Sequence, residues 1–167
     1  MIQRYPNAFV PDFYAELAAL GASGLFAAGG PQVANRAYYV PAVFNLPSQL
    51  TTISFVAANG TGNYDLGFYD GYTKLKVAST GSTAMSAAGV KTLTFSPDYR
   101  VRPGKLYYAA VAFSSTSASL WRAAAPDVTS HIQAGEAQEA SALPLPSTMT
   151  PATLASAHAP VFIFGIR

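Results

Sequence analysis

Pairs of carboxylates are the first candidates for chemistry, because two acidic side chains that face each other can act as general acid and base. Asp65 and Asp70 lie within one strand-and-turn unit of the sequence. Their offset of five residues places them on opposite faces of a straight strand, whereas a glycosidase needs both carboxylates in one cleft. Asp65 with Asp98 stays open as a pair, with no pattern in its favour. Asp is typical of turns, so we interpret these residues as turn and hydrogen-bonding groups.

The other residue types that do chemistry lack the companions that catalysis requires. His131 and His158 are the two histidines, and neither belongs to an HxH or HExxH pattern. The chain has no cysteine, no Gly-x-Ser-x-Gly elbow, no Walker loop and no Asp-x-Asp-x-Asp calcium loop. We therefore predict that the protein is not an enzyme, and we predict no catalytic residue, no cofactor and no metal.

The basic residues are spread less evenly along the chain than the acidic ones. Between positions 74 and 105 the sequence places a single acidic residue, Asp98, among Lys74, Lys76, Lys91, Arg100, Arg102 and Lys105. Neighbouring strands could gather these cations into one patch that docks on an acidic protein surface. The alternative is ordinary solubilising charge on outward strand faces, and strand order decides between the two. The partner-binding residues predicted from this set are Lys74, Lys76, Arg100 and Arg102.

Aromatic residues supply the remaining candidates for partner binding. The N-terminal region contains more of them than a solvated tail would carry, namely Tyr5, Phe9, Phe13, Tyr14 and Phe26. They need a surface to bury against, either the protein's own body or a neighbouring subunit. Trp121 is predicted at a strand end, where it could anchor an interface or stack on a sugar, the alternative being a core or rim tryptophan.

The composition of the chain is poor in charge and rich in apolar residues. Charged residues make up 11% of it, against roughly 25% in a typical soluble domain. Such a chain either hides part of its surface against neighbours, which predicts a homo-oligomer (a dimer or a trimer), or is a small monomeric domain rich in Ser and Thr. The net charge of +2 is too small for a nucleic-acid binder. No segment has the apolar length of a signal peptide or a membrane span, so we expect no membrane partner.

The elements that must position these residues are mostly strands, as the alternation of apolar and polar residues indicates. The side chains expected to face inward are Ile53, Phe55, Tyr64, Leu66, Phe68, Leu75, Val77, Leu93 and Phe95. Residues 105–113 are apolar on both faces, which predicts a central strand or one covered on both sides. Residues 161–166 are also apolar throughout, so we expect them to return into the sheet beside an early strand. Pro41 predicts an edge position or a bend.

These strands predict an all-β fold, an antiparallel β-sandwich of the jelly-roll or Greek-key type. Residues 1–36 are predicted to form an N-terminal arm with a short helix from Asp12 to Leu20, followed by a flexible connector at 23–31. Residues 37–167 are predicted to form the sandwich domain, with an irregular insertion at about 123–159.

Two motifs in the sandwich region resemble a known family. Gly67-Phe68-Tyr69-Asp70, followed by 74–81 (KLKVASTG), is similar to the "G-x-Y-D … L-V-x-S-T-G" ribbon of small β-sandwich domains in structural proteins of tailed bacteriophages. Residues 103–110 (PGKLYYAA) resemble the "L-x-P-G-x-Y-Y-L-A" strand that follows it there. The likeness covers about residues 50–115, and 1–36 and 123–159 match nothing in it. It implies a virion component, either a capsid decoration (cement) protein or a tail-associated domain.

Two functions follow from the residues and the resemblance together. The first is a capsid decoration protein that binds the major capsid protein on the outer surface and stabilises adjacent capsomers, located in the virion after assembly in the host cytoplasm. The alternative is a tail-fibre or spike-associated module that binds host glycan. The tyrosines that could stack on sugars in the alternative include Tyr38, Tyr39, Tyr69, Tyr72, Tyr107 and Tyr108. The absence of repeats or coiled-coil heptads favours the first function.

Overall fold

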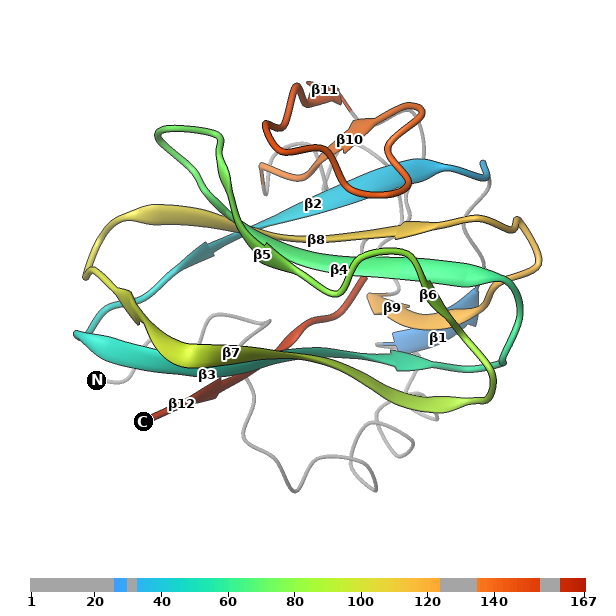
Figure 1. Ribbon diagram of the computed structural model, residues 1–167, viewed down its shortest axis with the longest axis horizontal. Helices are drawn as coiled ribbons and strands as arrows, with labels where there is room; N and C mark the ends of the chain where they lie inside the picture. Colours follow the sequence, from blue (N-terminus) through green and yellow to red (C-terminus); the bar gives the residue numbers. More distant parts are fainter. Residues whose placement is uncertain (1–25, 30–32, 124–134, 154–159) are drawn as a thin grey trace.

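A computed structural model of the chain describes residues 26–29, 33–123, 135–153 and 160–167. Within these residues the chain forms strands and no helix. The strands build two antiparallel sheets that pack face to face (Figure 1). The prediction of an all-β, antiparallel sandwich is therefore confirmed. The predicted helix from Asp12 to Leu20 lies outside the described residues.

Sheet A contains five strands within the described part of the chain. Its path runs through β1 (Phe26–Gly29), β9 (Leu120–Ala123), β3 (Ser48–Ala57) and β12 (Ile163–Ile166), and β7 (Gly89–Val101) pairs with the other side of β3. The apolar C-terminal strand β12 thus returns beside an early strand, as predicted. Part of the segment expected to be a flexible connector is instead the strand β1, which pairs with β9.

Sheet B contains seven strands within the same residues. Its order is β11 (Ala152–Thr153), β10 (Ala137–Glu139), β2 (Arg36–Val43), β8 (Leu106–Phe113), β4 (Asn63–Asp70) and β5 (Lys76–Ser79), with β6 (Thr83–Ala84) also paired to β4. Strand β10 pairs with β2 at residues 37–39. Pro41 therefore lies where β2 has lost its neighbour on that side, which agrees with the predicted edge position.

The main core fills the space between the two sheets. Leu66 and Phe68 of β4 face Phe55 of β3 and Phe95 of β7 there, all of them buried. The register of β3 against β7 shifts between Leu50 and Thr52, and this bulge keeps both Leu50 and Ile53 on the core side. The inward positions expected on these strands are confirmed. Leu75 is the exception, because it precedes β5 in a turn and is 52% exposed.

Strand β8 is covered on both faces, as its two apolar faces predicted. It lies between β2 and β4, and its small outward residues Ala110 and Ala112 leave room above the sheet. The rings of Tyr39 and Tyr69 occupy that room in an edge-to-face contact, with their centroids 5.5 Å apart. Leu145 and Met149 close over them and form a second buried cluster.

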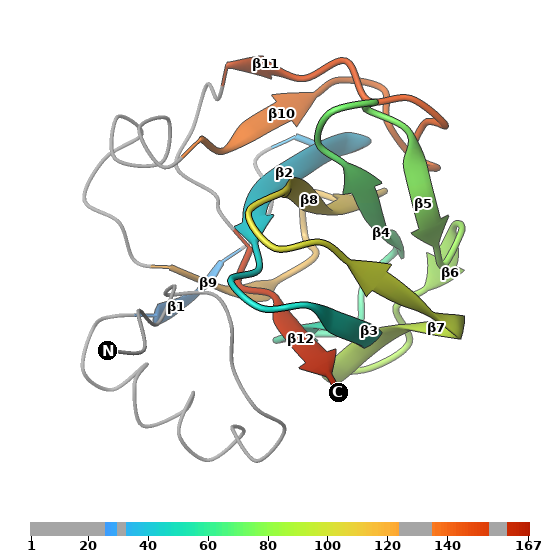
Figure 2. The ribbon, with the colours of Figure 1, turned by 90° about the vertical axis from the view of Figure 1, so that its left-hand side faces the viewer.

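Residues 135–153, which we call the strap, make that cover (Figure 2). They lie within the segment expected to be an irregular insertion, and they contribute β10 and β11 to sheet B. Asp65 is fully buried beneath the strap and accepts a 2.9 Å hydrogen bond from the Leu145 backbone N–H. The Tyr69 hydroxyl donates to the Pro146 carbonyl at 2.7 Å. Polar side chains of the sheet therefore hold the strap in place.

Candidate docking surface

One end of the sandwich brings together three turns that are far apart in the sequence. They are the β2–β3 turn (44–47), the β4–β5 turn (71–75) and the β7–β8 turn (102–105), and Arg167 lies beside them after β12. This end is on the left in Figure 1 and faces the viewer in Figure 2. We call these residues the turn end.

Backbone hydrogen bonds tie the three turns to one another. Gly104 N–H donates to the Phe44 carbonyl and Gly71 N–H to the Leu106 carbonyl, each at 2.9 Å. A Cβ on Gly71 would lie 2.5 Å from the Leu106 carbonyl oxygen, so this close approach requires glycine. The turn end is consequently a built surface whose parts are fixed relative to one another.

Asp70 organises the β4–β5 turn. One carboxylate oxygen accepts hydrogen bonds from the backbone N–H groups of Tyr72 and Thr73, at 2.9 and 3.1 Å, and the other pairs with Lys105. Burial favours the neutral acid, but the hydrogen bonds from Lys105, Thr73 and Tyr72 outweigh it and lower the pKa of Asp70 below its ordinary value. The turn role expected for this residue is therefore what the structure shows.

Apolar side chains are exposed at the turn end. Tyr72 is 88% exposed and Leu46 72% exposed, and Leu75 and Leu106 also face solvent. Among the described residues, the other exposed large apolar side chains are Val33 and Ile166, and Ile166 precedes Arg167. An exposed apolar group bordered by polar residues is typical of a protein–protein contact surface.

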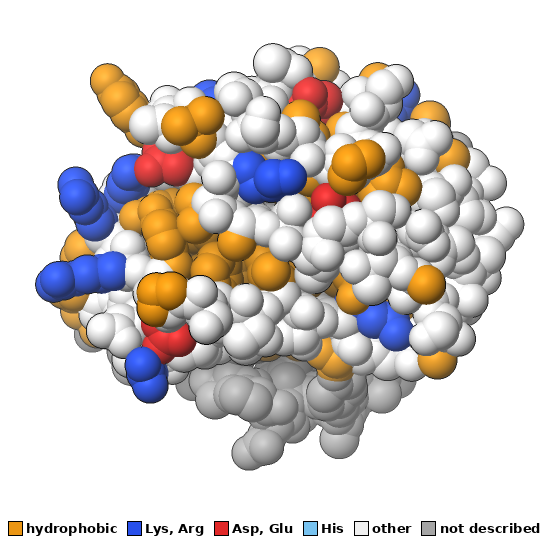
Figure 3. Space-filling model, viewed as in Figure 1, with side chains coloured by type: hydrophobic (Ala, Val, Ile, Leu, Met, Phe, Trp, Pro, Cys, Tyr) orange, Lys and Arg blue, Asp and Glu red, His pale blue; other side chains and the backbone are white. Residues whose placement is uncertain are grey.

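Cations surround these apolar side chains. Figure 3 shows Lys and Arg side chains crowded at the end of the molecule where the turns lie. Lys105 is paired with Asp70, and the Lys74 Nζ lies over the Tyr108 ring, 5.1 Å from its centroid. Arg100 and Arg102 are exposed, and neither guanidinium has a carboxylate partner among the described residues.

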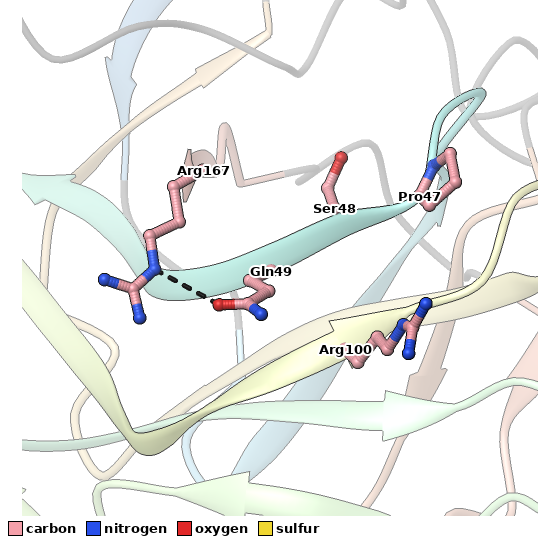
Figure 4. A pocket seen from close by; sticks show the side chains of 5 residues that line it. All are labelled: Pro47, Ser48, Gln49, Arg100 and Arg167. Atoms are coloured by element: carbon pink, nitrogen blue, oxygen red, sulfur yellow. Dashed lines mark hydrogen bonds between the residues drawn. The ribbon is translucent and has the colours of Figure 1, made fainter.

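A shallow groove runs along this surface beside Arg100. A depression of about 610 Å³ is lined by Pro47, Ser48, Gln49, Arg100 and Arg167 (Figure 4). A second one of about 360 Å³ is lined by Pro47, Arg100, Val101, Arg102 and Pro103. Because the two depressions share Pro47 and Arg100, we treat them as one groove.

Strand register places two arginines on either side of Gln49. Gln49 of β3 lies opposite Arg100 of β7, and on its other side it exchanges two backbone hydrogen bonds with Arg167, at 2.9 and 3.0 Å. The Arg167 Nε also donates to the Gln49 side chain at 3.2 Å, as Figure 4 shows, and its Nη2 pairs with Asp98 at 2.5 Å. The guanidinium of Arg167 is thus held internally, whereas that of Arg100 is available.

The predicted partner-binding residues do not all lie at this surface. Lys74, Arg100 and Arg102 are brought together at the turn end, but the Lys76 Nζ donates to the Leu145 carbonyl of the strap at 2.7 Å. Trp121 is half-buried in β9, on the side of sheet A where β9 pairs with β1. Phe26 belongs to β1, and Tyr5, Phe9, Phe13 and Tyr14 lie outside the described residues.

The groove also contains residues that the sequence did not single out. Pro47, Gln49 and Arg167 come from two chain segments that are far from Arg100 in the sequence. The Asn45-Leu46-Pro47 tripeptide is a turn signal that could have pointed to the first of them. Nothing local distinguishes Gln49 or Arg167, because their role follows from strand pairing.

The described residues show no arrangement of acidic groups that fits hydrolysis. Asp65 lies under the strap and Asp70 at the turn end, so the two carboxylates are apart, as their offset predicted. No group of three or more His, Cys, Asp or Glu in this part of the chain could hold a metal ion. Nor does this part contain a helix long and apolar enough to cross a membrane.

Most of the tyrosines considered as sugar platforms are inside the protein. Tyr38, Tyr39, Tyr69 and Tyr107 are buried and Tyr108 is half-buried, which leaves Tyr72 exposed among them. Burial raises the pKa of Tyr39 and Tyr69 well above the ordinary value, so their hydroxyls stay protonated as donors. Comparisons of the chain with protein-family models, curated proteins and solved structures gave no match.

Proposed function

We propose that this protein is a virion structural protein of a tailed bacteriophage, a capsid decoration (cement) protein that docks on the outer capsid surface and stabilises adjacent capsomers. The observation that carries the proposal is the turn end, where exposed apolar side chains adjoin the unpaired guanidinium groups of Arg100 and Arg102. An apolar centre with charged neighbours suits specific docking on another protein.

The composition of the chain supports the same proposal. Only 11% of its residues are charged, so a concentration of cations at one end stands out against a mostly uncharged body. A protein that spends its life attached to a shell needs less solubilising charge than a free monomer. The motifs at 67–81 and 103–110, which resemble phage β-sandwich domains, form parts of the turn end.

The proposal extends to assembly and topology. We propose that the protein acts as a symmetric dimer or trimer and that its sandwich belongs to the jelly-roll or Greek-key type. Its partner is the major capsid protein, and it reaches the virion after assembly in the host cytoplasm. Symmetric copies suit an icosahedral shell because each local symmetry axis presents the same surface several times.

The tail-associated, glycan-binding alternative has less support. Stacking on sugars needs exposed aromatic faces, and among the tyrosines named for that role Tyr72 alone is fully accessible. Trp121 is half-buried and lies away from the turn end. We therefore keep this function as an outcome of the test rather than as a second proposal.

The test is co-sedimentation with undecorated capsids assembled from the major capsid protein of the same genome. The expected result is saturable binding with a fixed ratio to capsid subunits and a higher melting temperature of the decorated shell. Retention on host polysaccharide without capsid binding would overturn the proposal in favour of the alternative. The position of the gene, beside a major capsid gene or a tail-fibre gene, is an independent check.

A further inference from the structure

Arg100 and Arg102 project from the same face of the chain at the end of β7. Val101 lies between them and is 1% exposed, with its side chain in the core between the sheets. Because successive side chains of an extended strand alternate, its two neighbours point outward together. Residues two positions apart on a strand are separated by roughly 7 Å. The groove therefore presents two guanidinium groups at the spacing of an extended chain.

These two cations are the ones that remain available in the groove. Arg167 is occupied by Gln49 and Asp98. Pro47, Ser48 and Gln49, which form the other wall, carry no charge, so they neither attract nor repel a bound anion. A ligand that enters the groove thus meets a polar but neutral wall on one side and two free guanidinium groups on the other.

We propose that the groove binds an extended protein segment that carries acidic residues at positions i and i+2. In such a segment the two carboxylates lie on one side at the same spacing as Arg100 and Arg102, so each can form a charge-assisted, two-pronged pair with one guanidinium. This inference rests on the proposed function, since the segment belongs to the capsid surface on which the protein docks.

The charge count favours an acidic protein segment over nucleic acid or a lipid surface. Nucleic-acid binding relies on many phosphate contacts, whereas the groove offers two free guanidinium groups and the chain has a net charge of +2. Leu46, directly before Pro47, is 72% exposed and offers an apolar contact that a phosphate backbone cannot use. A protein segment supplies both carboxylates and apolar side chains.

The experiment compares two capped peptides of identical composition and charge. One has a Glu-Thr-Glu centre, and the other has a Glu-Glu-Thr centre that places the carboxylates on opposite sides of an extended chain. We expect the first to bind about tenfold more tightly, as one additional charge-assisted pair implies. Binding is followed by amide chemical shifts, which are expected to change at residues 47–49 and 100–103.

Charge-matched variants locate the contact. Arg100→Gln and Arg102→Gln are each expected to weaken binding of the Glu-Thr-Glu peptide about tenfold. Lys91→Gln removes the same charge at the other end of β7, where Lys91 lies opposite Phe55, and should change the affinity less than about twofold. Equal binding of both peptides, or an equal loss in Lys91→Gln, would overturn the proposal.

Two further arms separate this inference from its rivals and from the proposed function. Tighter binding of single-stranded DNA or of phosphatidylserine vesicles than of the peptide, lost in Arg100→Gln, would identify a general anion surface and overturn it. If the wild type and the Arg100→Gln/Arg102→Gln variant co-sediment equally with capsids, the inference fails while the proposed function stands. If the peptides are distinguished but no capsid binds, the groove stands and the proposed function fails.

Discussion

The strap-covered face of sheet B and the turn end treat polar side chains in opposite ways. Under the strap, both carboxylate oxygens of Asp65 accept hydrogen bonds, from Leu145 N–H and from the Thr80 hydroxyl, in a fully buried site. At the turn end, Arg100 and Arg102 are exposed and bind no carboxylate within the described part of the chain. One region has closed its polar network and the other has left its charges available.

This difference separates stability from recognition. A buried polar group must be paired inside the protein, so its loss is felt in the free energy of unfolding. An exposed cation costs the fold little and can serve a partner. Substitutions in the two regions should therefore affect different measurements, and this gives a way to test the division.

The largest effect on stability is expected for Asp65→Ala. The substitution removes the acceptor for the buried Leu145 N–H, and a buried donor without a partner costs about 3 kcal/mol when the lost acceptor is charged. Urea unfolding measures the loss, and amide hydrogen exchange at residues 142–149 shows whether the strap detaches. Asp65→Asn keeps one oxygen and should lose less. A cost below about 1 kcal/mol would mean that the strap does not depend on this anchor.

A smaller loss is expected for Tyr39→Phe. The Tyr39 hydroxyl donates to Glu139 at 2.7 Å, and Glu139 also accepts from the Thr150 backbone and hydroxyl, so it keeps two partners after the change. The expected cost is about 1 kcal/mol. Tyr72→Phe at the turn end is the matched control and should leave the free energy of unfolding unchanged, because Tyr72 is exposed. Equal losses in both variants would contradict the division.

Asp70 connects the turn end to stability through pH. Its pKa is lowered in the folded protein, so its ionised form stabilises the fold above the ordinary pKa of Asp, and this contribution disappears as the pH falls through the lowered value. Asp70→Asn should therefore cost about 1 kcal/mol near pH 7. The gap between the two proteins should close on acidification below about pH 4. Chemical unfolding across this range measures it, and a gap independent of pH would exclude the ionic role.

The smallest effect on stability is expected for Arg100→Gln with Arg102→Gln. Both side chains are exposed, so the free energy of unfolding should change by less than about 0.5 kcal/mol. Capsid co-sedimentation should nevertheless fall sharply and lose much of its salt dependence. Thermal unfolding and sedimentation of the same preparation test both statements. A large loss of stability would show that these arginines serve the fold.

Local pattern was enough to predict most strands and their inward faces. Leu93 and Phe95 follow the period of two and are buried, and β8 is covered on both sides because both of its faces are apolar. Leu75 broke the pattern because the turn before β5 places Lys74 at a φ of 65° and interrupts the alternation. Alternation holds only while the backbone stays extended.

The candidate site was less accessible to the same reasoning. The basic residues could be counted, but their grouping depends on which strands are neighbours, and Lys76 proved to serve the strap while Arg100 and Arg102 face solvent. Gln49 and Arg167 carried no local signal. They join Arg100 because β3 pairs with β7 on one side and extends the β12 pairing on the other.

The sequence by itself determined the all-β class, the inward residues of most strands and the scarcity of charge. Each of these follows from composition or from a two-residue period, which are properties of short segments. The tertiary structure alone decided that the strap buries Asp65 and that three distant turns and Arg167 share one end. Burial and proximity arise from pairing between residues up to about a hundred positions apart, and no local pattern encodes that pairing.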